Sequence, residues 1–202
     1  MMSTSDAYSA YSDYRIKWAS LPWETGEALA LRRRVFCDEQ AIFDQDDRDA
    51  IDDSAHLLVA LGCTGGWYEQ VVGTVRIHES APGLWHGSRL AVDPAFRAQG
   101  RLGSTLIRLA VSSAHALGCQ RFLARVQAQN EALFKQMHWQ SIGEELILDR
   151  PHVVMEADLN HYPPCHSPLS GFVVPGRQRQ PLAELAPGLL KILSAPTLRQ
   201  AS

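Results

Sequence analysis

A segment that could bind phosphate lies near the middle of the chain. The apolar residues 90–92 end in Asp93-Pro94, a stretch with arginine and glycine follows over residues 97–103, and helical periodicity begins directly after it. This order predicts a strand, a loop with unpaired backbone N–H groups, and a helix N-terminus that points at the loop. Unpaired amides and the helix dipole both favour negative charge, so the segment can bind a phosphate group.

The segment does not match two other kinds of phosphate loop. A nucleotide-binding P-loop requires G-x-x-x-x-G-K-[ST], and no lysine follows Gly100 or Gly103 at that spacing. A dinucleotide fingerprint requires three glycines at G-x-G-x-x-G and an acidic residue about 20 positions further on. An ordinary strand-to-helix connection, in which glycines are also common, stays open as the alternative.

Hydrophobic periodicity predicts a mixed α/β domain. Apolar runs bounded by turn residues predict strands over residues 14–18, 57–61, 71–78, 84–92, 121–126, 142–148 and 152–159. Apolar spacings of three and four predict a helix that begins near Pro22, a helix over residues 104–117 that ends at Gly118, and a short helix over residues 130–137 capped by Asn130. The order of these elements predicts one mixed sheet with helices packed on it.

Composition and charge argue against several classes of protein. The chain has 202 residues, 46% of them hydrophobic, and a formal net charge of −3, which argues against nucleic-acid and membrane partners. No apolar run approaches the ~18–20 residues that span a bilayer, and the N-terminus lacks the basic and apolar regions of a signal peptide. The four cysteines are scattered, so we expect a cytoplasmic protein without disulfides or a metal site.

Changes in composition divide the chain into three parts. Residues 1–13 are rich in Ser, Tyr and Asp and are expected to be flexible. Residues 14–160 carry the predicted strands and helices and form the domain. Prolines recur over residues 161–202, which indicates an extension rather than a second domain. Contact of this extension with a second copy, and with it a homodimer, stays open.

Three groups of residues resemble the GNAT acetyltransferase superfamily. Residues 89–103 are similar to its acyl-CoA pyrophosphate loop, and residues 127–139 to a downstream segment of that family. Residues 35–40, with Asp46-Asp47, residues 55–57 and residues 151–155, resemble the branch of ElaA-like proteins and, more distantly, acyl-homoserine-lactone synthases. The resemblance covers about residues 14–160. It implies an α+β fold with a mainly antiparallel sheet of six to seven strands and helices on both faces.

The resemblance implies acyl-CoA, with acetyl-CoA as the expected form, as co-substrate and no metal. Main-chain groups of strand residues would pair with pantetheine, loop N–H groups would bind the pyrophosphate, and two arginines would add charge. These residues are Leu90, Ala91, Val92, Arg97, Ala98, Gln99, Gly100, Arg101, Leu102, Gly103 and Ser104. Asn130 and Phe134 are expected to complete the site. Leu102 stands where a small residue is usual, Phe134 replaces a tyrosine that often protonates the thiolate, and His138-Trp139 replaces Gly-Phe.

Three residues are candidates for acid–base catalysis. Acyl transfer to an amine requires loss of a proton, which a base of near-neutral pKa can accept. His86 occupies the position at which histone-acetylating relatives carry a catalytic glutamate, and imidazole suits the task. Glu79, with its neighbour His78, is a rival base, although a polar hairpin end explains both. His138 is a candidate proton donor, and a histidine packed under a helix is the alternative for His86.

Acceptor binding is expected from the region after the first helix and from two strand arginines. Phe36, Glu39 and Gln40 lie where relatives place acceptor loops, although a helix end explains them equally well. Arg76 and Arg125 either pair with acids such as Asp53 or Glu156 or bind an anionic substrate, and we favour pairing because unpaired charges on strands are unfavourable. The acidic residues of segment 44–53 lack the spacing of a calcium loop, which indicates a solvated acidic loop.

These observations favour an N-acyltransferase that moves an acyl group, with acetyl expected, from acyl-CoA to a small-molecule amine. Two alternatives stay open. One is a GNAT-fold module that binds CoA or a metabolite without turnover. The other is an acyl-homoserine-lactone-type synthase that uses an acyl carrier, for which the acidic segment is a poor docking face.

Overall fold

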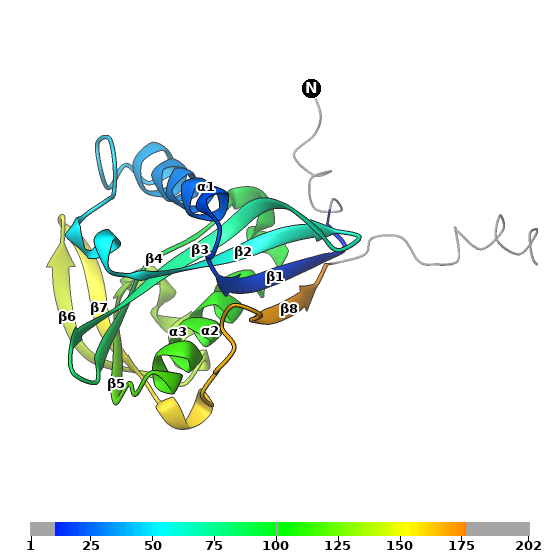
Figure 1. The fold of residues 1–202 in the computed structure, drawn as a ribbon. Helices are drawn as coiled ribbons and strands as arrows, with labels where there is room; N and C mark the ends of the chain where they lie inside the picture. The colour runs from blue at the N-terminus through cyan, green and yellow to red at the C-terminus, as the bar shows by residue number, and fades with distance from the viewer. Residues whose placement is uncertain (1–10, 100, 177–202) are drawn as a thin grey trace, which may run out of the picture.

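The computed structural model describes residues 11–99 and 101–176, and within them eight strands form one sheet (Figure 1). The strands are β1 (Asp13–Trp18), β2 (His56–Thr64), β3 (Trp67–Ala81), β4 (Leu84–Val92), β5 (Arg121–Gln127), β6 (Trp139–Ile147), β7 (Arg150–Ala157) and β8 (Phe172–Pro175). Their order across the sheet is β6-β7-β5-β4-β3-β2-β1-β8. All neighbours are antiparallel except β4 and β5, which run parallel. The predicted fold class is therefore confirmed.

The helices cover both faces of the sheet, as expected (Figure 1). On one face lies α1 (Pro22–Arg33), which continues into a π-helical turn, Arg34–Glu39. On the other face lie α2 (Leu102–Ala116) and α3 (Glu131–Gln136). Short 3₁₀ turns occupy Ala50–Asp53, Pro94–Gln99, Ala128–Asn130 and Leu159–His161.

The position of α2 follows from its sequence. Its apolar face is fully buried against the sheet, chiefly against β3 and β4, and includes Leu106, Leu109 and Val111. The helix ends as predicted at Gly118, whose φ of 91° suits a residue without a side chain. It begins at Leu102, two residues before the predicted start, because Leu102 is 2% exposed and packs into the core.

The parallel pair β4–β5 opens into a gap beyond its first few residues. Paired residues run from Leu84 and Arg121 to Gly87 and Ala124, and the pairing ends there. Between the pairs Thr74–Ala91 and Arg76–Ser88, β4 has one more residue than β3, which makes a β-bulge. Arg89 lies in this bulge and has a φ of 53°. The later part of β4 keeps its bonds to β3 but leaves its other edge unpaired with β5.

The structure differs from the sequence predictions at two elements. The sheet has eight strands among the described residues rather than six to seven, because Phe172–Pro175 pairs with β1 as an added edge strand. This strand has only four residues and ends in a proline, so its hydrophobic periodicity is too short to predict it. Asn130 lies at the N-cap position of α3 but makes no capping hydrogen bond, so its predicted capping role is wrong. Flexibility is predicted for residues 1–13, of which residues 1–10 lie outside the described residues, as do residues 177–202 of the extension. Tyr11 is buried and Asp13 begins β1.

Candidate active site

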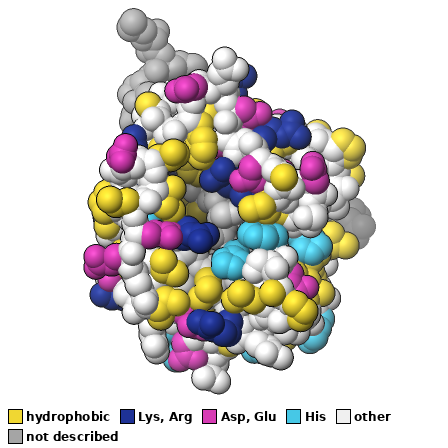
Figure 2. Space-filling view, turned by 90° about the vertical axis from the view of Figure 1, so that its left-hand side faces the viewer, with side chains coloured by type: hydrophobic (Ala, Val, Ile, Leu, Met, Phe, Trp, Pro, Cys, Tyr) yellow, Lys and Arg dark blue, Asp and Glu magenta, His cyan; other side chains and the backbone are white. Residues whose placement is uncertain are grey.

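A cavity of about 550 Å³ lies at the gap between β4 and β5. It is lined from the β4 strand by residues 86–90 and from β5 by residues 124–127. Further walls come from α2, α3, the segment after α1, and the β6–β7 turn. Figure 2 shows a hollow in the face of the molecule bordered by hydrophobic, arginine and histidine side chains. This volume is typical of a small-molecule site.

One side of the cavity is a strand edge that, in the part of the chain the structure describes, has no strand partner beyond its first few residues. Beyond Gly87 the β4 edge that faces β5 has no strand partner among the described residues. The N-terminus of α2 lies beside the end of this edge, since a Cβ added at Gly103 would lie 3.8 Å from Val92 Cγ2. No side chain caps this helix at Arg101, and the N–H groups of a first helical turn have no partner within the helix. An extended chain that ends in a phosphate fits these two features together.

The two loop arginines differ in their surroundings. Both terminal nitrogens of Arg97 bond Glu39 at 2.6 Å, and its Nε bonds the Val92 carbonyl at 3.0 Å. This ion pair ties the loop to the π-helical turn and neutralises Arg97. Arg101 is exposed. Of the remaining predicted loop residues, Ala98 is exposed, Ser104 is partly buried, and nothing is described for Gly100.

Two histidines from neighbouring strands line the cavity together. His78 of β3 and His86 of β4 are directly paired across the sheet, and their rings stack with centroids 5.4 Å apart. Burial, His78 and Arg125 lower the pKa of His86 below its usual value. Burial and Arg76 lower the pKa of His78 as well. Both shifts favour the neutral ring, which can accept a proton.

The other two candidate acid–base residues do not line the cavity. Glu79 accepts a hydrogen bond from the Gly83 N–H at 2.8 Å and stabilises the β3–β4 hairpin. His138 has a φ of 63° and stacks on His161 with ring centroids 3.6 Å apart. The structure thus groups His86 with His78 and leaves Glu79 and His138 elsewhere.

Phe36 and Gln40 reach the cavity from the segment after α1. The side-chain amide of Gln127 donates to Gln40 Oε1 at 3.1 Å, and Arg150 donates to the Gln40 carbonyl at 2.7 Å. These bonds join the segment after α1 to β5 and to the β6–β7 turn. Glu39 is not among the lining residues and instead pairs with Arg97.

The acidic segment is only in part the solvated loop that its composition indicates. Asp47 is 1% exposed, and its Oδ2 lies 2.8 Å from Arg32 Nε and 3.0 Å from Arg89 Nε. Asp52 bonds Arg32 at 2.6 and 3.0 Å and lies 2.9 Å from Arg76. The prediction of a solvated loop is wrong for Asp47 and Asp52, because three arginines from α1, β3 and β4 converge beneath the segment and need counter-charges. The other four aspartates are exposed, as predicted: Asp44, Asp46, Asp49 and Asp53.

The strand arginines are paired, as predicted, but with other acids. Arg76 is 2% exposed and pairs with Asp49 and Asp52 rather than Asp53. Arg125 pairs with Glu145 of β6 rather than with Glu156. Glu156 instead forms a two-bond pair with Arg121 at 2.8 and 2.9 Å.

The Arg–Asp cluster is expected to support the fold strongly. The change Asp47→Ala would leave the guanidinium groups of Arg32 and Arg89 without their shared buried partner, which is expected to cost about 3–5 kcal/mol of unfolding free energy. Urea denaturation followed by circular dichroism measures it. Asp46→Ala, at an exposed neighbour, is the control and should change stability by less than ~0.5 kcal/mol. Equal effects of the two substitutions would contradict a structural role for the cluster.

The same cluster gives stability a defined pH dependence. Burial opposes ionisation of Asp52, but hydrogen bonds from Arg32 and from the Asp49 N–H outweigh it and hold the pKa of Asp52 well below its usual range. A hydrogen bond from Arg76 likewise lowers the pKa of Asp49. Stability from groups with lowered pKa is fully present above the unfolded value near 4 and is lost as the pH falls through the folded value.

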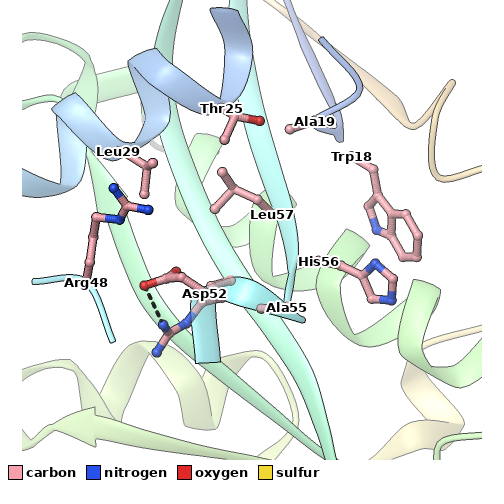
Figure 3. Close-up of a pocket in the computed structure, with 10 residues that line it drawn as sticks. Trp18, Ala19, Thr25, Leu29, Arg48, Asp52, Ala55, His56 and Leu57 are labelled. Atoms are coloured by element: carbon pink, nitrogen blue, oxygen red, sulfur yellow. Dashed lines mark ion pairs between the residues drawn. The ribbon is translucent and has the colours of Figure 1, made fainter. Parts of the chain in front are cut away.

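A smaller pocket of about 250 Å³ lies on the other side of the Arg76–Asp52 pair (Figure 3). It is lined by the end of β1, by α1, and by the start of β2. Trp18 and His56 stack at one end with ring centroids 4.2 Å apart, and Arg48 and Leu29 lie at the other. It shares Arg76 with the larger cavity.

Sequence reasoning missed several residues that line the larger cavity. Arg89, Phe43 and His152 line it, and the guanidinium of Arg89 lies 4.6 Å from the ring centroid of Phe43. The one signal that the sequence offers for Arg89 is a charged residue inside the predicted strand 84–92. No spacing rule indicates Phe43 or His152, because tertiary contacts place both the loop that carries Phe43 and the start of β7 that carries His152.

The comparison with protein families identifies the class of this chain. Residues 16–139 match the model of the acetyltransferase (GNAT) family. This match covers more than half of the chain, so the protein belongs to the GNAT acetyltransferase family. Members of the family use acyl-CoA and transfer acyl groups to small-molecule acceptors.

Solved structures with the same fold agree with this placement. A putative N-acetyltransferase from Lactobacillus plantarum matches with a TM-score of 0.63 and 20% identity, over 71% of this chain and 97% of its own. Escherichia coli ElaA matches with a TM-score of 0.59 and 18% identity, over 72% and 98%. TofI, in a ternary complex with an inhibitor and MTA, matches with a TM-score of 0.55 and 18% identity, over 74% and 95%. The predicted resemblance to ElaA-like proteins and acyl-homoserine-lactone synthases is confirmed at the level of the fold.

No curated protein matches this chain. Within residues 11–99 and 101–176, the helices fall short of the length and hydropathy that a bilayer span requires.

Proposed function

We propose that this protein transfers an acetyl group from acetyl-CoA to the amine of a small molecule. The observation that carries the proposal is the meeting of the unpaired β4 edge with the N-terminus of α2 at a cavity. Main-chain groups of Leu90, Ala91 and Val92 would hold the extended pantetheine as a strand holds its neighbour. The N–H groups of residues 98–104 would hold the diphosphate.

His86 is the proposed general base. The amine nitrogen attacks the thioester carbonyl carbon, the C–N bond forms, the C–S bond breaks, and the amine proton passes to the imidazole. A general base works best when its pKa lies near the operating pH, because it must be unprotonated and still basic enough to take the proton. The lowered pKa of His86 keeps its ring in the accepting form. His78, stacked against it, holds the ring in place and adds to that lowering.

The proposed chemistry needs no dedicated proton donor for the leaving group. Phe134 is 7% exposed and packs edge-to-face on Trp139, with ring centroids 5.1 Å apart. It lines the cavity but has no proton to give. The CoA thiolate is a good leaving group and takes its proton from water.

Two measurements test the proposal. Isothermal titration calorimetry should detect acetyl-CoA binding, and a thiol-reactive dye should detect CoA release when amines are added. A protein that binds acetyl-CoA but releases no thiol with any amine would be a binding module. Activity with an acyl carrier protein and none with acyl-CoA would instead indicate a synthase of the acyl-homoserine-lactone type.

A further inference from the structure

The charges around the larger cavity are balanced. The formally charged residues that line it are Asp49, Arg76, Arg89 and Arg125. Each arginine has a carboxylate partner in the structure, and Asp49 is shared between Arg76 and Arg89. Counted with the partners behind the wall, four arginines face four carboxylates: Arg32, Arg76, Arg89, Arg125, Asp47, Asp49, Asp52 and Glu145. No charge is left over for a charged substituent of the acceptor.

The walls on the acceptor side are largely apolar, with Gln40 and the paired Asp49 as polar members. The segment between α1 and β2 contributes four large side chains and the β6–β7 turn contributes two: Phe36, Ile42, Phe43, Ile51, Ile147 and Leu148. The two groups are held together by the bond from Arg150 to the Gln40 carbonyl. The ring of Phe43 also covers the guanidinium of Arg89, with 4.6 Å between the guanidinium carbon and the ring centroid. The side on which an acceptor must enter is therefore hydrophobic.

We propose that the acceptor is a primary amine with an uncharged, largely apolar body, such as an arylalkylamine or a long alkylamine. This inference rests on the proposed acetyl transfer. A carboxylate or a second ammonium on the acceptor would be buried without a partner, which is strongly unfavourable. The single ammonium releases its proton to solvent before the free amine enters, so the reacting molecule and the cavity are both neutral. The C–N bond then forms as the C–S bond breaks, a second proton passes from the nitrogen to His86, and the CoA thiolate leaves.

Two matched pairs of amines test the acceptor class. 2-Phenylethylamine and phenylalanine differ by a carboxylate, and hexylamine and 1,6-diaminohexane differ by a second ammonium. We expect 2-phenylethylamine and hexylamine, which carry no second charge, to have a kcat/KM about 100-fold higher than their charged partners. Thiol release from acetyl-CoA measures this ratio. Calorimetric titration of the four amines into the protein–CoA complex measures their binding directly.

The outcomes separate this inference from the proposed function. Thiol release or binding that favours the charged members would overturn the acceptor class while leaving acetyl transfer intact. Binding of the apolar amines without thiol release by any amine would contradict acetyl transfer instead. Binding of none of the four amines would contradict the acceptor class.

A specificity change gives a second readout. Ile147→Glu places a carboxylate in the apolar wall, at the tip of an edge strand and across the pair from Arg150, whose guanidinium is bonded to the Gln40 carbonyl. It should raise the preference for 1,6-diaminohexane over hexylamine about 10-fold. Leu146→Glu is the matched control: it adds the same charge one residue away, at a side chain that is 74% exposed and outside the cavity lining. An unchanged preference in Ile147→Glu would place the acceptor elsewhere.

Discussion

The change Ser104→Glu is expected to weaken acetyl-CoA binding about 100-fold, because it places a carboxylate where the diphosphate would meet the first turn of α2. The same carboxylate interacts favourably with the helix dipole and should stabilise the fold by ~0.3–1 kcal/mol. Binding and stability should therefore change in opposite directions. Calorimetric titration gives the dissociation constant, and thermal unfolding gives the stability.

Two control variants isolate the effect of charge at Ser104. Ser104→Gln adds similar bulk but no charge, and its affinity should stay within about threefold of wild type because the backbone N–H group is kept. Gln140→Glu adds the same charge at an exposed position on β6 and should bind like wild type. If Ser104→Glu also bound acetyl-CoA with wild-type affinity, the diphosphate would not lie at this helix end.

The change His86→Gln is expected to lower kcat by at least about 100-fold, which is the usual contribution of a general base. Acetyl-CoA affinity should change little, because the proposed contacts with CoA come from the main chain of other residues. Steady-state kinetics with a saturating amine gives kcat, and calorimetry gives the affinity. Wild-type turnover in His86→Gln would remove this residue from the mechanism.

The pH dependence of activity is an independent test of His86 as the general base. The base must be neutral, so activity should be fully present above its folded pKa and fall as the pH drops through it. Burial, His78 and Arg125 lower that pKa below the ordinary histidine value. At a saturating concentration of amine, log kcat should therefore be flat near pH 7 and decline only in more acidic solution. His86→Gln should lack this acidic limb. His138→Asn is the control, because asparagine tolerates the positive φ at that position and His138 lies outside the cavity.

The elements that carry the site could be predicted because their signals are local. The apolar face of α2 and the glycine at its end specify that helix from neighbouring residues alone. The run over residues 84–92 likewise predicted β4 within its observed bounds. His86 reached the cavity because a strand places alternate residues on one face, and cross-strand pairing brings His78 beside it.

The charged wall of the cavity could not be predicted because its parts come from distant segments. Nothing local distinguishes the buried Asp47 from the exposed Asp46. The difference arises only when α1, β3 and β4 bring Arg32, Arg76 and Arg89 together. Arg97 is a similar case, since its pairing with Glu39 depends on a π-helical turn that no periodicity indicates.

Amide NMR tests the central claim most directly. On titration with CoA, the backbone N–H resonances of Leu102, Gly103 and Ser104 are expected to shift strongly downfield as they donate hydrogen bonds to the diphosphate. Pantetheine, which lacks the diphosphate, should perturb the β4 amides of residues 90–92 and leave those three largely unmoved. Saturable binding of CoA with the three α2 amides unchanged would contradict the account.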